Sequence, residues 1–443
     1  MSYWLAAVAG VVVFEAVAVP SQNDPGVSLL RLPVGGQRIS LAEVLLIGGA
    51  LIYFVRERRR VQLRLPAVLW ILFLAWYASA GFRGALAGHR LSVVAFEGRA
   101  LVTLGVPILV LATLRGDALF SSRRAQLFGA YLLAPGVALW CVAVGRHILG
   151  LPIPAAGVVP LLGSVNLSAF GADGATAISV VGTCLAAVAL GGNRPRWRLV
   201  FGGGVLMASA VLADQRGAFL ASLGSGAVIV GAVLANSEWR PDVLAAARQI
   251  PRGYVVAVCL ATVGAILVAG PWQLAAGLHE QYVSTFASTA KAESANSRVL
   301  QQESAVKDIT ARPLMGWGLG REYVRFEPGP NTYLVTDVYH NTALDIGVRT
   351  GAIGLSLFCV AVGATLIASL RASLEAGTRT HVAGPILGAG ASLIGLMLRS
   401  GVESLLEKYR LTLLAGLLLG SLLSLHCSRG VRAGAVSSEK EDT

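Results

Sequence analysis

Residues 66–81 read PAVLWILFLAWYASAG, sixteen consecutive positions without a charged side chain. Eleven further apolar stretches of comparable length are spread along the chain. A backbone in lipid must satisfy its own hydrogen bonds, which favours an α-helix in each stretch. The alternating apolar and polar positions of a membrane β-barrel are not seen. The sequence therefore predicts an all-α polytopic membrane protein with about 12 transmembrane helices.

The spans that we expect are slightly short for a bilayer, which needs roughly 20 residues per crossing, so flanking residues must contribute. They cover residues 2–19, 40–55, 66–81, 99–114, 126–145, 174–192, 198–213, 217–235, 254–270, 350–370, 382–398 and 411–426. Between the ninth and tenth spans lies the one long polar segment, residues 271–349. We expect this segment to be a large, partly helical loop outside the cytoplasm.

The composition agrees with this fold class. The chain has 443 residues, of which 55% are hydrophobic and 14% are charged, and its mean hydropathy is +0.67. Soluble domains do not reach such values. No Pro/Ser-rich or charged linker divides the chain, so residues 1–443 are predicted to form a single integral membrane domain. The five cysteines lie in or at the end of apolar stretches without metal-ligand spacing, which indicates small buried residues.

The net charge of +12 does not indicate a nucleic-acid partner, because the basic residues form short clusters between spans. Membrane orientation and anionic lipid head groups explain these clusters better. Placing the cluster of residues 56–60 in the cytoplasm puts most Lys and Arg of the short loops on that side, as the positive-inside rule requires. Both termini of this multi-pass protein are then predicted to be cytoplasmic, and residues 271–349 to face outward. In a bacterium this places the protein in the inner (cytoplasmic) membrane, with residues 271–349 in the periplasm or on the outer face. Residues 1–19 lack a basic leading region and are expected to be an uncleaved first span.

The strongest candidate for chemistry is Tyr339-His340-Asn341 in the long polar segment. The pattern Thr342-x-x-Asp345 that follows matches a capping box and predicts a helix start. His340 then lies just before a helix N-terminus, where the dipole favours neutral imidazole, the form that accepts a proton. The alternative is a histidine that only satisfies a hydrogen bond within the loop.

Two arginines are candidates for anion binding. Arg216, in Asp214-Gln-Arg-Gly, is predicted at the outer end of a span, where an anion site or a snorkelling side chain would explain it. Arg298 follows Asn296 and Ser297, which could cap a helix that ends before Pro313. A cation in the first turn opposes the helix dipole, which suggests a function, although a solvated arginine is the alternative.

Other patterns argue against several reaction types. The run Gly316-Trp-Gly-Leu-Gly320 is not a phosphate-binding loop and is interpreted as a structural turn. No two histidines have metal-ligand spacing, so neither a metal nor another cofactor is expected. No G-x-S-x-G motif accompanies His340, which disfavours serine hydrolysis.

Taken in order, these motifs resemble the O-antigen ligase and polymerase superfamily. The resemblance rests on residues 214–217, 296–298, 312–318, 340–341 and 351–354, and residues 31–41 resemble that family's first outward loop. It implies a glycosyltransferase that takes a glycan from an undecaprenyl-diphosphate carrier and attaches it to a glycan, glycolipid or protein hydroxyl. It further implies that His340 is the catalytic base, that Arg216 and Arg298 hold the carrier diphosphate, and that Arg99, near the outer end of the fourth span, corresponds to another basic residue of the family.

The chemistry of the residues supports this interpretation. Guanidinium groups bind phosphate oxygens bidentately and stay protonated, so they suit a departing diphosphate. A single displacement assisted by His340, without a metal, would invert the anomeric carbon. Ligase and polymerase differ only in the acceptor, and we expect a ligase-like acceptor. The alternatives are a secondary transporter or lipid-linked glycan flippase, for which Glu15 is the main acidic candidate within a span, and a non-catalytic assembly subunit.

Overall fold

The structure of the protein is a computed structural model. It describes residues 2–18, 32–34, 37–56, 64–113, 123–148, 157–159, 163–165, 172–190, 196–211, 216–235, 289–327, 332–336, 339–375, 383–401, 404–406, 408 and 410–424.

Long helices make up most of the described chain. They are α1 (Ser2–Ala18), α2 (Leu41–Arg56), α3 (Leu65–Leu86), α4 (Leu91–Ala100), α5 (Val106–Ala112), α7 (Arg123–Ile148), α8 (Ala172–Leu190), α9 (Trp197–Val211), α10 (Arg216–Ala235), α14 (Thr289–Ala311), α15 (Thr342–Glu375), α16 (Ala383–Ser400) and a last apolar helix, Arg410–Ser424. A π-helical turn, η1 (Leu101–Gly105), joins α4 to α5.

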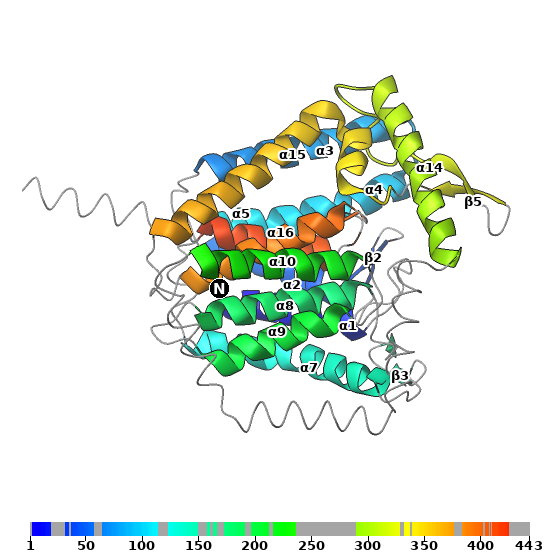
Figure 1. Cartoon of the computed structure of the whole chain (residues 1–443). Helices are drawn as coiled ribbons and strands as arrows, with labels where there is room; N and C mark the ends of the chain where they lie inside the picture. Colours follow the sequence, from blue (N-terminus) through cyan, green and yellow to red (C-terminus); the bar gives the residue numbers. More distant parts are fainter. Residues whose placement is uncertain are drawn as a thin grey trace, which may run out of the picture.

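Three antiparallel hairpins complete the described elements. They are β1 (Leu32–Val34) with β2 (Gln37–Ile39), β3 (Gly157–Val159) with β4 (Gly163–Val165), and β5 (Tyr323–Glu327) with β6 (Thr332–Thr336). Figure 1 shows the long helices side by side, with α14 and the labels of β2, β3 and β5 all at the right-hand end. We call this end the hairpin end of the bundle.

The prediction of a polytopic helical membrane protein is confirmed. Seven described helices are long and apolar enough to cross a membrane, and four shorter apolar helices accompany them. Eleven of the predicted spans coincide with these helices, and the ninth, residues 254–270, lies outside the described residues. The number of about 12 spans therefore stays a prediction.

Two helix boundaries differ from those expected. The fourth span begins at Leu91, ahead of residue 99, because Glu97 and Arg99 lower the local hydropathy but form ion pairs within the protein. The tenth begins at Thr342, ahead of residue 350, and Gly351 has non-helical dihedral angles (φ 69°, ψ −171°) inside it. α15 is therefore two helical segments, residues 342–350 and 352–375, joined at a kink.

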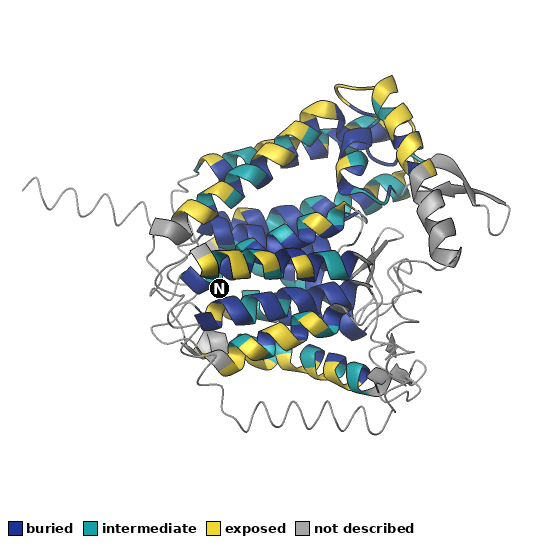
Figure 2. Ribbon diagram, viewed as in Figure 1, coloured by how far each residue is buried: buried dark blue, intermediate teal, exposed yellow. Residues whose placement is uncertain are grey.

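The core lies where the helices pack most closely. Figure 2 shows buried residues concentrated on α8 and α16 and exposed residues on the outer faces of α7, α9 and α15.

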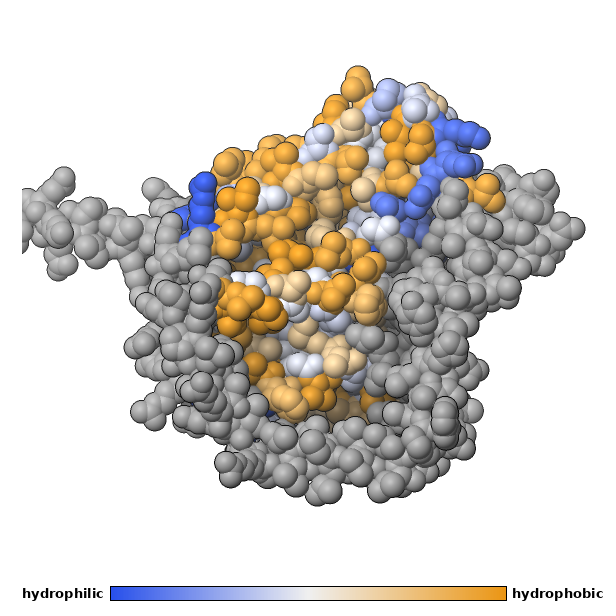
Figure 3. Space-filling model, in the orientation of Figure 1, coloured by the Kyte–Doolittle hydropathy of each residue, from blue (hydrophilic) through white to orange (hydrophobic). Residues whose placement is uncertain are grey.

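Close packing of α8 and α9 needs small residues, as is common for helices in membranes. A Cβ at Gly203 of α9 would lie 2.8 Å from the backbone nitrogen of Ala186 in α8. Figure 3 shows an apolar surface over the described helices, with hydrophilic residues gathered at α14 and at the opposite end.

Candidate active site

The start of α15 holds the predicted catalytic residue. His340 lies two residues before Thr342, where the helix begins as predicted, but the predicted capping box is wrong. The cap is Asn341, whose Oδ1 accepts hydrogen bonds from the backbone N–H groups of Ala343 (2.9 Å) and Leu344 (3.2 Å). Thr342 Oγ1 instead accepts the N–H of Leu405 at 2.7 Å.

Asp345, the other residue of the expected capping box, belongs to a buried ionic group at the same end of α15. Arg349 Nη2 forms ion pairs with Asp345 Oδ1 at 2.8 Å and with Glu97 Oε1 of α4 at 3.2 Å, and all three side chains are at most 1% exposed. Ser404 donates to Asp345 Oδ2 at 3.2 Å. Sequence reasoning missed this group, although the four-residue spacing of Asp345 and Arg349 is that of a helical ion pair.

Helix α14 packs across the start of α15. Ala305, Tyr339 and Val348 form a buried apolar cluster, and the Tyr339 hydroxyl donates to Asp308 Oδ2 at 2.8 Å. A small pocket lies beside this cluster. It is lined by Gln301, Gln302, Tyr339, His340, Asn341 and Leu344, and its volume is about 10 Å³. His340 therefore faces residues of α14 in a pocket with room for about one water-sized group.

Arg298 lies on the same helix as the pocket residues. It precedes Gln301 by three residues, so their backbones are about one helical turn apart. The predicted cap at Asn296 or Ser297 is wrong, because α14 begins at Thr289 and Arg298 lies well inside it. The residues before Asn296 are rich in Ala, Lys and Glu, which are good helix formers.

Arg216 is the first residue of α10, and its backbone lies beside the end of α16. A Cβ built on the next residue, Gly217, would lie 3.0 Å from Arg399 Cγ and Nε. Arg399 pairs with Asp173 at 3.1 Å, and two residues after it the Gly401 carbonyl accepts a hydrogen bond from Asn341 Nδ2 at 3.0 Å. These contacts place the start of α10 and the His340 segment at the same end of α16.

Arg99 has a partner within the protein. Its Nε donates to Glu43 Oε1 at 2.6 Å, and its Nη2 pairs with Glu43 Oε2. Glu43 also accepts the N–H of Ser40, and the Ser40 hydroxyl accepts the N–H of Glu43, which is a capping box at the start of α2. Arg99 therefore joins α4 to α2.

The glycine run has the structural role that was predicted. Gly316, Gly318 and Gly320 all have positive φ angles, and the Gly318 N–H donates to the Arg349 carbonyl at 3.0 Å. A Cβ at Gly318 would lie 2.5 Å from the backbone nitrogen of Gly84 in α3. The Gly320 N–H donates to Glu97 Oε2 at 2.6 Å. This turn therefore ties the loop after α14 to α3, α4 and α15.

Aromatic stacking holds the same turn against α14. The Trp317 ring lies between the guanidinium groups of Arg312 and Arg321, 4.0 and 4.1 Å from its centroid. Its Nε1 donates to the Asp308 carbonyl at 2.9 Å. Together with the Tyr339–Asp308 bond, this fixes α14 relative to His340.

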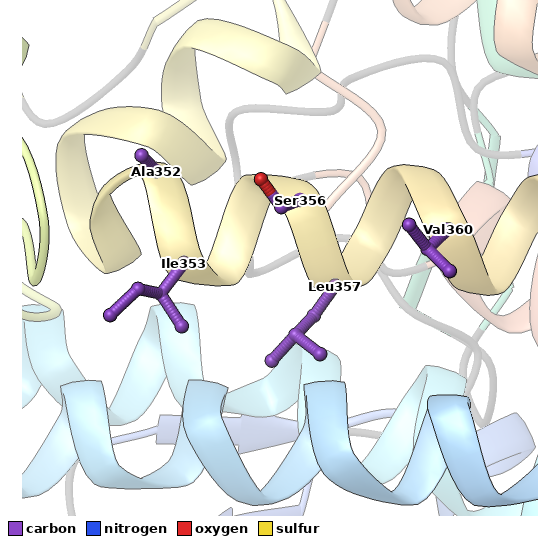
Figure 4. Close-up of a pocket in the computed structure, with 5 residues that line it drawn as sticks. All are labelled: Ala352, Ile353, Ser356, Leu357 and Val360. Atoms are coloured by element: carbon purple, nitrogen blue, oxygen red, sulfur yellow. The ribbon is translucent and has the colours of Figure 1, made fainter.

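An apolar hollow of about 400 Å³ lies farther along α15. It is lined by Ala352, Ile353, Ser356, Leu357 and Val360, so it begins one residue after the kink at Gly351. Figure 4 shows Ile353 and Leu357 pointing from α15 toward the pale blue helices. In the part of the chain that the structure describes, no three His, Cys, Asp or Glu residues are grouped to hold a metal ion.

Comparison with protein families finds a match in this part of the chain. The O-antigen ligase family matches residues 204–359, from within α9 into α15. Arg216, Arg298 and His340 lie inside the matched range, and Arg99 lies outside it. No curated protein matches the sequence. Residues 204–359 thus form an O-antigen ligase domain, and the protein is a membrane enzyme of the type that transfers lipid-linked glycans.

Proposed function

We propose that the protein transfers a glycan from undecaprenyl diphosphate to an acceptor hydroxyl, with His340 as general base. The observation that carries this proposal is the position of His340, which lines a pocket at the start of α15 inside the matched family range. Base assistance of this kind contributes about 10²–10⁴-fold to a rate. The acceptor is a glycan, a glycolipid or a protein.

The carrier diphosphate is the leaving group in this proposal. Arg216, at the start of α10, and Arg298, on α14, would stabilise its charge as the sugar–oxygen bond breaks. Arg99 is the third proposed contact, and its guanidinium is already matched by Glu43. In this proposal His340 accepts the proton and the arginines stabilise the charge, so the reaction needs neither a metal nor another cofactor. A single displacement of this kind inverts the anomeric carbon.

The carrier tail fits the apolar hollow along α15. Ser356 is the one residue with a polar side chain among the five that line this hollow, so hydrocarbon suits it better than a sugar. A carrier lying there would have its tail beside the membrane segment of α15 and its head toward the helix start that follows His340. This arrangement supports a lipid-linked donor.

The hairpin end is proposed to face the outside of the bacterial inner membrane. The predicted charge distribution supports this orientation, with the two termini in the cytoplasm. The ninth span is proposed within residues 254–270, and the catalytic loop within residues 271–349.

Purified protein in proteoliposomes tests the proposal. Supplied with lipid-linked glycan and candidate acceptors, the wild-type protein should form a new glycosidic linkage and release undecaprenyl diphosphate. His340→Ala should lower the rate by about 10²–10⁴-fold at an unchanged thermal midpoint. Full activity of this variant would remove His340 from the mechanism. Transport of the glycan without a covalent product would instead favour a flippase.

The same assay separates a ligase from a polymerase. A ligase attaches the glycan to a glycolipid or protein hydroxyl, whereas a polymerase extends a second lipid-linked chain. The family match covers both types of transfer, so the chemical identity of the acceptor in the product decides between them.

A further inference from the structure

The buried face of α14 carries a polar residue where an apolar one is expected. Gln301, Ala305 and Ile309 are spaced four residues apart and so lie on one face of the helix. Ala305 is fully buried in the cluster with Tyr339, and Ile309 packs against that cluster. Gln301 continues this face and is only 2% exposed.

The amide of Gln301 is buried, and among the residues that the structure describes neither its Oε1 nor its Nε2 has a hydrogen-bond partner. Burying an unpaired amide is unfavourable, and most buried polar side-chain atoms in proteins are paired. Asn341, in the same pocket, shows the usual situation, because its amide bonds to Ala343, Leu344 and Gly401. A group that enters the pocket would give Gln301 its missing partner.

The pocket restricts what that group can be. Gln301 and His340 line it together, and its volume of about 10 Å³ admits one oxygen-sized group. An amide is neutral, so it suits a hydroxyl better than a charged diphosphate, and its N–H can donate to the hydroxyl oxygen. The hydroxyl that meets His340 in the proposed reaction is that of the acceptor.

We propose that Gln301 binds the reacting hydroxyl of the acceptor, an inference that rests on the proposed function. Its Nε2–H donates to the hydroxyl oxygen, while the hydroxyl proton points to His340. The oxygen then forms the bond to the anomeric carbon, the bond from that carbon to the diphosphate oxygen breaks, and the diphosphate leaves with the electron pair. The proton passes to His340.

The test is Gln301→Met, which keeps the approximate volume of the side chain and removes both amide atoms. The KM for the acceptor should rise about threefold to tenfold, the range expected for one neutral hydrogen bond. The KM for the lipid-linked donor should not change. The thermal midpoint should stay level or rise, because an unpaired buried amide has been removed.

Val306→Met is the matched control, since it places the same side chain at an exposed position of α14, and it should change none of these values. An unchanged acceptor KM for Gln301→Met in an otherwise active protein would overturn the role of Gln301 alone. A lower thermal midpoint would also overturn it, by assigning Gln301 a structural role. A wild-type protein without any transfer would overturn the proposed function, and this inference with it.

Discussion

Two buried polar regions adjoin the start of α15, and they differ in how their polar groups are paired. In the ionic group, Arg349 contacts Glu97 and Asp345, and Gly320 and Ser404 donate further hydrogen bonds to these carboxylates. In the His340 pocket, the Gln301 amide has no hydrogen-bond partner within the described part of the chain. The first region lies between α4, α15 and the glycine turn, and the second lies between α14 and α15.

We expect this difference to separate residues that support the fold from residues that bind a substrate. Polar groups that are paired within the protein connect elements that are far apart in the sequence, as Arg349 connects α15 to α4. A buried polar group without a partner calls for an explanation, and a role in binding is the one that we propose for Gln301. Changes in the ionic group should therefore affect stability first, and changes around the pocket should affect transfer first.

The largest expected effect is on stability. Arg349→Met leaves Glu97 and Asp345 buried without their guanidinium and should lower the free energy of unfolding by about 3–5 kcal/mol. Unfolding of the detergent-solubilised protein measures this. Adding Glu97→Gln and Asp345→Asn removes the uncompensated charges and should restore most of the loss. A change below about 1 kcal/mol in the single variant would contradict the supporting role.

For the two candidate diphosphate-binding arginines, we expect weaker transfer without a change in stability. Arg216→Ala and Arg298→Ala should each raise the KM for the lipid-linked donor about tenfold to a hundredfold, the value of charge-assisted hydrogen bonds to a diphosphate. Lysine at either position should restore only part of the loss, because bidentate geometry is missing. Lys307→Ala, an exposed cation on α14, is the control. Full rescue by lysine at both positions would defeat the bidentate argument.

The smallest expected effect is the loss of stability on substitution of Asn341, the residue that follows His340. Asn341→Ala removes the cap of α15 and should lower the free energy of unfolding by about 1 kcal/mol. Asn341→Asp keeps the cap oxygen and should remain close to wild type, although it loses the donor to Gly401. Thermal unfolding of both variants compares the contribution of the cap with that of the Gly401 hydrogen bond. Equal losses of stability in Asn341→Ala and Asn341→Asp would show that the Gly401 contact, and not the cap, stabilises this helix start.

Hydropathy alone predicted most of the helices, because a membrane span is defined by its own composition. The helix start at Thr342 and the glycine turn were also predicted correctly, since both depend on local backbone preferences. The capping box was wrong because distant residues take its side chains: Leu405 bonds to Thr342, and Ser404 bonds to Asp345.

The site was less predictable than the fold, for the same reason. The start of α14 was placed too late because Asn296 and Ser297 favour caps, although the good helix formers before them extend the helix to Thr289. The four-residue spacing from Ala305 and Ile309 could have indicated that Gln301 lies on the buried face of α14. That the Gln301 amide lacks a described partner can be seen only in the packing of α14 against α15. The roles of His340, Arg216, Arg298 and Arg99 stay predictions.

The kink at Gly351 determines what holds the His340 segment in place. A Cβ there would overlap the Leu314 carbonyl, so the loop crosses α15 in direct backbone contact, and the Ala352 N–H donates to the Pro313 carbonyl at 2.7 Å. Residues 342–350 are bound to the same loop by two further hydrogen bonds, from the Trp317 N–H to the Val348 carbonyl at 2.8 Å and from the Gly318 N–H to the Arg349 carbonyl at 3.0 Å. We therefore expect a thicker or thinner bilayer to tilt residues 352–375 more than the short segment. The position of His340 should then depend little on bilayer thickness, which would suit an enzyme that acts on lipid-linked glycans.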